Sequence, residues 1–197
     1  MVTRTELVSR LEREFLDHGY ANLTMINIAK SVDVTRRTLY NYFSSKEDAF
    51  RFLIENGNAC AVDLGMSAGR SALVSGQSTV DVLATILDVR YGDARRRLAR
   101  SPHAVEINDQ AFRRCRDIMV ASAIAFQAVL ACFIEELEAK ALIKTRAGIS
   151  FADLAQLLAD GTRGTNQSLP PIPPDQLILR YRAMVRALLH GAVEGAA

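Results

Sequence analysis

The sequence predicts an all-α protein, and three observations support this fold class. Ala, Leu and Arg, which favour helices, dominate the 197 residues, whereas alternating β-branched runs are almost absent. Apolar residues recur at helical spacing along most of the chain. Four of the five prolines lie in one short stretch, "LPPIPP", which leaves the rest of the chain free to form helices. With 49% hydrophobic residues, the chain can bury a substantial core.

The N-terminal region predicts three helices. The first has apolar residues at helical spacing, and Gly19 is placed to end it. Thr24 is a good N-cap for a second helix in "MINIAKSV", and Thr35 for a third in "RRTLYNYF". Because only a tight turn separates the last two helices, this region predicts a helix-turn-helix.

The third of these helices has an apolar anchor and a polar outer strip. Leu39 and Phe43 are four residues apart, so they share one helical face, which we expect to be buried. At about 100° per residue, Arg37, Thr38 and Asn41 lie roughly opposite that face, and a tyrosine flanks the strip on either side. Exposed hydrogen-bonding groups after a positively charged first turn are typical of a recognition helix.

Further helices are expected over the remaining residues. Ser45 lies in capping-box spacing with an aspartate and begins a helix that links the N-terminal region to the rest. Later helices are expected near Gln77 to Tyr91, near His103 to Asn108 and from about Gln110 to Lys140. We therefore expect two domains. A helix-turn-helix domain occupies residues 1–50, and a helical effector-binding and dimerisation domain occupies residues 51–197.

The segment "IMVASAIAFQAVLACFI" carries no charge, and only Ser122 and Gln127 in it are clearly polar. A helix that is apolar on all sides is either buried or spans a membrane. Its length is at the lower edge of the roughly 17 to 25 residues that a span needs, and Gln127 interrupts it. We therefore expect a buried central helix and no membrane.

The last predicted helix, "DQLILRYRAMVRALLH", carries one apolar stripe, which needs a partner surface. We expect this stripe at a dimer interface. Its members are Leu177, Tyr181, Met184 and Leu188.

Several functional classes find no support in the sequence. Cys60, Cys115 and Cys132 are odd in number and lack CxxC spacing, so neither a disulfide framework nor a zinc site is indicated. The three histidines are scattered, and "GTRGTNQS" lacks the Lys-Ser/Thr pair of a phosphate-binding loop. We expect no enzyme activity, no metal and no cofactor. The N-terminus carries charges and no apolar signal region, which favours a cytoplasmic location.

The segment "LTMINIAKSVDVTRRTLYNYFSSKEDAF", Leu23 to Phe50, resembles the N-terminal signature of the tetracycline-repressor (TetR/AcrR) family of bacterial transcriptional regulators. The resemblance covers about the first quarter of the chain; the remainder is similar only in length and helical plan. It implies a homodimer that binds a palindromic operator in double-stranded DNA, usually as a repressor. A small-molecule effector entering the second domain would release the DNA.

The resemblance also implies roles for individual residues. The residues expected to contact base edges are Arg36, Arg37, Thr38 and Asn41. The residues expected to hold phosphates are Thr24, Tyr40, Tyr42 and Lys46. Ser122 and Gln127 are expected to orient a mostly apolar effector, although both could instead be hydrogen-bonded core groups.

Two positions depart from the family pattern. Asp33 stands in the turn, where the family usually has glycine. Aspartate tolerates positive φ better than most residues, so we expect the turn to form. Ile26 stands where many members carry a polar or basic residue that touches DNA, which weakens the expected contribution of the second helix to recognition.

A basic run extends from Arg90 to Arg116 and holds eight arginines against Asp93, Glu106 and Asp109. The net charge of only +2 does not decide its role, because attraction to phosphate depends on local patches. We expect a solvated or salt-bridged helix face. A second DNA surface and recognition of an anionic effector are the alternatives.

The sequence also allows a different class of function. A helix-turn-helix chain that has lost operator binding could serve as a protein-interaction module. Weak DNA affinity with little salt dependence would favour this alternative.

Overall fold

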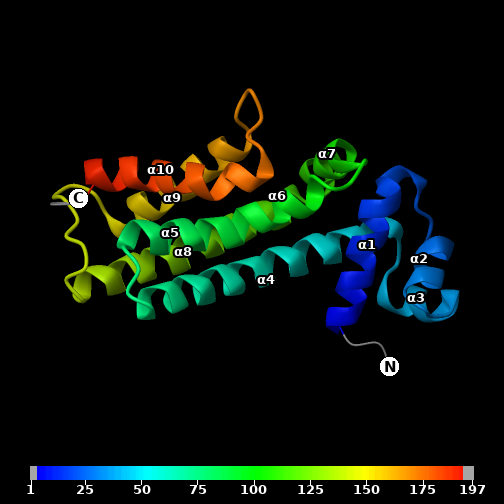
Figure 1. Cartoon of the computed structure of the whole chain (residues 1–197). Coiled ribbons are helices and arrows are strands. Elements are labelled where there is room, and N and C mark those ends of the chain that lie inside the picture. Colours follow the sequence, from blue (N-terminus) through cyan, green and yellow to red (C-terminus); the bar gives the residue numbers. More distant parts are fainter. Residues whose placement is uncertain (1–3, 193–197) are drawn as a thin grey trace. The chain divides into compact units, whose positions relative to one another are not determined.

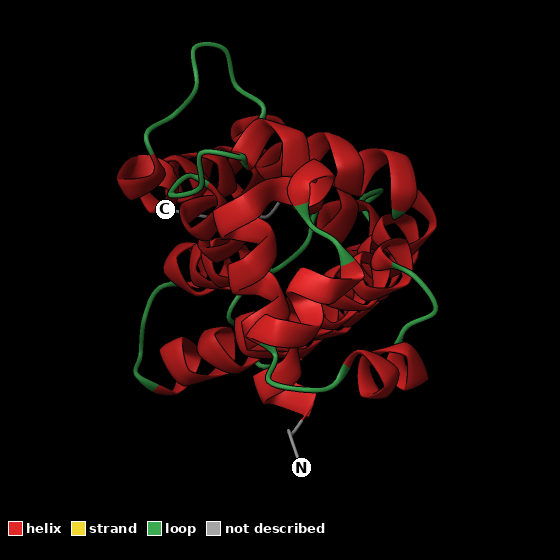
Figure 2. Cartoon of the chain, turned by 90° about the vertical axis from the view of Figure 1, so that its right-hand side faces the viewer, coloured by secondary structure: helices red, strands yellow, loops and turns green. Residues whose placement is uncertain are grey.

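The computed structural model describes residues 4–192, except for the side chains of residues 4 and 5, and confirms the all-α fold class. No strand occurs in this described part (Figure 2). The α-helices, labelled in Figure 1, are α1 (Arg4–Asn22), α2 (Met25–Ser31), α3 (Arg36–Tyr42), α4 (Lys46–Val74), α5 (Thr79–Leu87), α6 (Asp93–Leu98), α7 (Ala104–Arg114), α8 (Arg116–Ala139), α9 (Phe151–Asn166) and α10 (Leu177–Ala192). A π-helical turn, Asp88–Gly92, joins α5 to α6, and a short 3₁₀ turn, Pro174–Gln176, precedes α10.

The chain divides into two compact units. The first unit contains the residues up to Cys60 together with Arg97–Ser122. The second contains Ala61–Arg96 and the described residues from Ala123 onward. The segment Arg97–Ser122, which we expected in the second domain, thus packs with the N-terminal helices. The helices α4 and α8 each begin in the first unit and continue into the second.

The core of the first unit is built around aromatic side chains. The Phe15 ring centroid lies 5.0 Å from that of Phe50, and Tyr20 meets Phe50 edge-on at 5.2 Å. Cys115 is buried in the same core, and desolvation raises the pKa of its thiol to about 11. The cysteine is therefore a protonated, apolar core residue, as expected for a buried thiol.

Helix α1 is interrupted at Gly19, where the sequence predicted its end. Gly19 has φ +73° and ψ 173°, a conformation that residues with a side chain rarely adopt. A Cβ atom at this position would also collide with the carboxylate of Glu106 and the ring of His103. The Glu106 carboxylate accepts a hydrogen bond of 2.6 Å from the backbone nitrogen of Ala21, which fastens α1 to α7.

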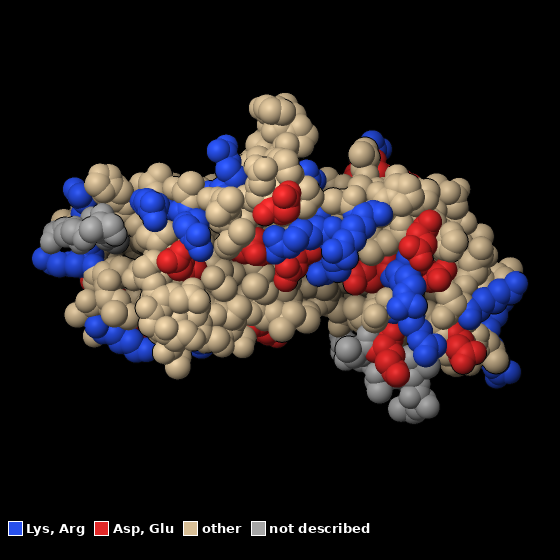
Figure 3. All heavy atoms as spheres, viewed as in Figure 1, with Lys and Arg blue, Asp and Glu red and all other residues tan. Residues whose placement is uncertain are grey.

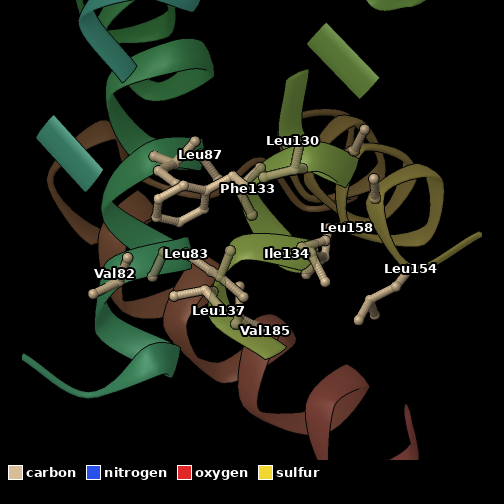
Figure 4. Close-up of a cluster of buried hydrophobic side chains, with 14 of the residues drawn as sticks. Val82, Leu83, Leu87, Leu130, Phe133, Ile134, Leu137, Leu154, Leu158 and Val185 are labelled. Carbon is tan, nitrogen blue, oxygen red and sulfur yellow. The ribbon is translucent and has the colours of Figure 1, made fainter. Parts of the chain in front are cut away.

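The second unit has its own apolar core, which α5, α8, α9 and α10 share (Figure 4). The residues labelled in Figure 4 are Val82, Leu83, Leu87, Leu130, Phe133, Ile134, Leu137, Leu154, Leu158 and Val185. Two glycines on α4, Gly65 and Gly69, allow this helix to lie close to Ile86 of α5. A Cβ atom on Gly65 would lie 3.0 Å from the carbonyl oxygen of Ile86.

The long helix expected from about Gln110 to Lys140 is wrong in one respect, because the chain forms two helices there. Cys115, with φ −124° and ψ 21°, separates α7 from α8, and its buried thiol fixes the break in the core of the first unit. The short helix expected near His103 to Asn108 accordingly extends to Arg114.

Helix α8 is also not buried on all sides. Phe126 and Leu130 on one face are fully buried, whereas Val120 and Ile124 on another are 51% and 62% exposed. The uncharged composition predicted burial, but the neighbouring helices cover only part of the circumference. By length and composition alone, α8 is the one helix in the described part of the chain that could span a membrane. In this fold it supplies core residues to the second unit.

Replacing Gly19 by alanine is expected to lower the free energy of unfolding by about 1 to 3 kcal/mol, because alanine would be strained at this φ. Gly57→Ala is the matched control. Gly57 lies within α4, and no neighbouring atom lies within 4 Å of the place that a Cβ atom would take. Alanine there should stabilise the helix by about 0.5 to 1 kcal/mol. Urea unfolding followed by circular dichroism measures both, and equal effects would contradict the strain at Gly19.

Candidate nucleic-acid interface

Both helices of the helix-turn-helix begin at the threonines expected from the sequence. The side-chain oxygen of Thr24 accepts a hydrogen bond of 3.3 Å from the backbone nitrogen of Asn27 at the start of α2. The Oγ1 atom of Thr35 accepts one of 3.0 Å from the nitrogen of Thr38 at the start of α3. These caps satisfy backbone donors that a short helix leaves unpaired, and they fix where α3 starts.

The turn between the helices forms with Asp33 at φ +57°, so aspartate replaces the usual glycine. The backbone nitrogen of Val34 donates to the carbonyl of Ala29 at 3.0 Å, which closes the turn. Arg10 of α1 donates from Nη1 to the carbonyl oxygen of Val32, also at 3.0 Å. This role of Arg10 was not predicted, because no local pattern reveals a contact across 22 residues.

The anchor of α3 is buried as expected. Leu39 is fully buried and Phe43 nearly so, and both belong to the core of the first unit. The Phe43 ring centroid lies 5.1 Å from that of Phe52 on α4. The opposite face of α3 therefore points to solvent in a fixed orientation.

The residues expected to contact bases occupy this outer face. Arg36, Arg37 and Asn41 are exposed. Thr38 is half-buried, and its hydroxyl lies 2.8 Å from that of Thr35, so the two hydroxyls share a hydrogen bond. Thr38 is thus the base-contact candidate whose polar group is already engaged.

The residues expected to hold phosphates differ in their surroundings. Tyr40 and Tyr42 are 43% and 53% exposed, and the guanidinium of Arg36 lies 5.6 Å from the Tyr40 ring centroid. Thr24 is exposed beside its cap contacts. The ammonium of Lys46 donates to the carbonyl oxygen of Tyr20 at 2.6 Å.

Lys46 is the phosphate candidate most involved in packing. Burial lowers the pKa of its ammonium, and the nearby Arg114 lowers it further. Its contact with Tyr20 holds the end of α1 to the start of α4. An ammonium has three donors, so this contact leaves Lys46 able to donate to a phosphate as well.

Most of the basic run is salt-bridged, which is the interpretation favoured from the sequence. Figure 3 shows acidic and basic side chains intermixed on the face in view. Four arginines of the run pair with carboxylates: Arg96 with Asp88 and Asp93, Arg97 with Glu12, Arg113 with Asp109, and Arg114 with Glu47. Arg90 is different, because it is buried.

The residues expected in the effector pocket and the dimer interface lie on two helices. Ser122 and Gln127 are both half-buried on α8. On α10, Leu177 and Tyr181 are fully buried in the second unit, whereas Met184 and Leu188 are half-buried and can also reach a partner. The Tyr181 hydroxyl donates to Oδ1 of an asparagine at 2.5 Å, which ties α10 to α9. In the described part of the chain, no group of His, Cys, Asp or Glu side chains is arranged to hold a metal ion.

A capped, anchored helix that presents arginine, asparagine and tyrosine after a tight turn defines a helix-turn-helix DNA-binding regulator. Residues 7–51 match the family model "Bacterial regulatory proteins, tetR family". The chain is a member of the TetR family by this N-terminal domain and by its all-helical fold.

Solved structures of TetR-type regulators share the fold over nearly the full length of the chain. A TetR transcription regulator from Haloarcula marismortui has a TM-score of 0.70 at 14% identity, covering 96% of this chain and 97% of that one. SmeT, the repressor of the Stenotrophomonas maltophilia multidrug efflux pump SmeDEF, has a TM-score of 0.64 at 14% identity, with 99% and 93% covered. Salmonella enterica GusR has 0.63 at 22%, with 95% of each chain covered. No curated protein matches the sequence.

Thr35→Ala is expected to destabilise α3 by about 1 kcal/mol, because the backbone nitrogen of Thr38 loses its cap. Amide exchange of the α3 backbone, measured by mass spectrometry, should then become about fivefold faster. Thr35→Ser keeps the hydroxyl and should exchange like the original protein. Equal exchange in the alanine variant would mean that the cap does not hold this helix.

Proposed function

We propose that the protein is an effector-responsive repressor that binds a palindromic operator as a homodimer. The outer face of α3 is the single observation that carries this proposal. Its base-reading side chains stand on a helix whose start is capped and whose other face is buried. We also propose that the protein has no catalytic activity and acts in the cytoplasm, in keeping with the regulators that share its fold.

The chemistry of this face suits sequence recognition in the major groove. An arginine can donate two hydrogen bonds to guanine, and an asparagine can pair with adenine. We assign these roles to Arg37 and Asn41, because both are exposed and neither belongs to the capping contacts. Tyr40 and Tyr42 flank them and would donate to phosphates, which fixes the register without reading sequence.

A dimer is needed to read two half-sites, whose centres lie about 34 Å or a multiple of this apart. We propose that α9 and α10 form the dimer surface. Besides the half-buried Met184 and Leu188, these helices expose Leu157 and Leu179, which are 47% and 58% exposed. Burying such side chains against a second copy would stabilise a dimer.

We propose that the effector acts by population shift. It would bind a conformation in which the two recognition helices no longer fit both half-sites, and it must bind this state more tightly than the DNA-bound one. The helices α4 and α8 can carry the change, since each continues from one unit into the other. In the first unit, Arg51 of α4 donates to Asp117 of α8 at 3.0 and 2.5 Å. This bidentate pair couples the starts of the two helices.

Operator binding is measured by fluorescence anisotropy of the full chain with duplexes from its own upstream region, over a salt titration. We expect tight, palindrome-dependent and salt-sensitive binding. Arg37→Ala should weaken operator binding about tenfold or more, since a bidentate base contact contributes about 1 to 3 kcal/mol. Arg100→Ala is the matched control, because Arg100 is exposed in the basic run outside the helix-turn-helix.

Each outcome of the anisotropy experiment has a direct meaning. Binding no tighter than to random DNA would overturn the repressor proposal and favour a protein-interaction module. Equal losses in the Arg37 and Arg100 variants would instead indicate that the basic run contributes a second DNA surface.

Two further variants separate base readout from phosphate binding. Asn41→Ala should reduce the preference for one base pair of the operator, while affinity for random DNA changes little. Tyr40→Phe removes only a hydroxyl and should weaken binding to every sequence by a similar factor. Competition between operator, single-base variants and random DNA measures both. If the two variants lose affinity for all sequences alike, the assignment of Asn41 to base readout is wrong.

A further inference from the structure

Arg90 is a buried arginine within the second unit. It lies on the π-helical turn Asp88–Gly92 and is only 6% exposed. Its guanidinium lies 4.8 Å from the ring centroid of Tyr91 and 5.7 Å from that of Phe126. Burial lowers the pKa of Arg90, but arginine stays protonated in proteins. The second unit therefore holds a positive charge inside an apolar region, which is costly in a purely structural role.

The hydroxyl of Tyr91 adds a hydrogen-bond donor beside this charge. It is buried and makes no hydrogen bond of ordinary geometry to the described residues. Burial raises the pKa of the phenol, whereas the positive charges of Arg90 and Arg163 lower it. Buried tyrosine hydroxyls are usually hydrogen-bonded. This hydroxyl is thus available to donate to a bound group.

The local charges favour an anion at this place. The positive charge of Arg163 is close enough to lower the pKa of Arg90, so the two guanidinium groups share one region. The acidic residue of the π-helical turn, Asp88, accepts hydrogen bonds of 3.0 and 2.8 Å from Arg96. Two cations and one hydroxyl donor form a site suited to a carboxylate, because charge-assisted hydrogen bonds are strong in a region of low polarity.

The backbone around Arg90 is arranged to place it inward. A π-helical turn inserts one residue into the regular helix, and such turns are frequent at functional sites. Gly65 on α4 leaves room for it, since a Cβ atom there would lie 3.4 Å from Cβ of Arg90. The adjoining surfaces are apolar, because Phe126 is fully buried and its ring meets that of Tyr91 edge-on at 5.7 Å.

We propose that Arg90 and Tyr91 bind the acidic group of the effector, and that this effector is a small organic acid with an apolar body. The guanidinium would take the carboxylate, the Tyr91 hydroxyl would donate a second hydrogen bond, and the Tyr91 and Phe126 rings would contact the apolar part. This inference rests on the proposed effector response and adds its chemical class. It also gives Arg90, unlike its salt-bridged neighbours in the basic run, a binding role.

The probes are benzoate, phenylacetate and hexanoate, each compared with the amide of the same carbon skeleton. Binding to the full chain is measured by isothermal titration calorimetry and by the thermal unfolding midpoint. We expect at least one acid to bind and to raise the midpoint, with an affinity about tenfold or more above that of its amide. The Arg90→Met variant should lose this difference, and Tyr91→Phe should bind the acid about fivefold more weakly.

The matched control is Arg70→Met. Arg70 also lies over an aromatic ring of the second unit, 5.3 Å from the Phe133 centroid, but pairs with Glu136 on the surface. This variant should bind the acid like the original protein. Arg90→Lys keeps the charge and serves where the methionine variant does not fold. It should bind more weakly than arginine, because an ammonium lacks the bidentate geometry.

The proposal is overturned if none of the three acids binds, if acids and amides bind equally, or if the Arg90 and Tyr91 variants bind like the original protein. Operator binding is measured in parallel and separates this inference from the proposed function. Acid binding through Arg90 without operator binding would remove the repressor role and leave the site. Operator binding without acid binding would do the reverse.

Discussion

Burial of Leu39 and Phe43 is the constraint on which the DNA-binding face depends. A seven-residue helix is too short to be stable alone, so packing must hold α3. These two side chains enter the core of the first unit, and the cap at Thr35 fixes where the helix begins. The arginines and the asparagine on the other face are then oriented without making contacts of their own. Preorganisation of this kind favours binding, since little entropy is lost when DNA arrives.

The first unit is held together by contacts between distant parts of the sequence. Glu106 caps the broken end of α1, and Arg51 pairs with Asp117 of α8. These contacts place α7 and the start of α8 in the same unit as the helix-turn-helix. A change in the second unit that shifts α8 would therefore act on the DNA-binding unit through ion pairs and hydrogen bonds as well as through the chain itself.

The second unit combines an apolar core with one buried region of positive charge. Most of its interior is formed by leucine, isoleucine, valine and phenylalanine side chains, which fit a stable helical domain. Arg90 and the hydroxyl of Tyr91 depart from this pattern within five residues of π-helical turn. Departures from regular packing often mark functional positions, because a stable fold tolerates their cost where binding recovers it.

The sequence by itself determined the all-helical class, the caps at Thr24 and Thr35, the buried anchor of α3 and the positive φ of Asp33. Periodicity and capping act within a few residues, so a single sequence reveals them. The tertiary structure decided the break at Cys115, the exposed face of α8, the contact of Arg10 with Val32 and the burial of Arg90. Each depends on side chains far apart in the sequence, whose meeting is set by the packing of whole helices. The same reason explains why four arginines of one basic run form surface ion pairs while Arg90 is enclosed.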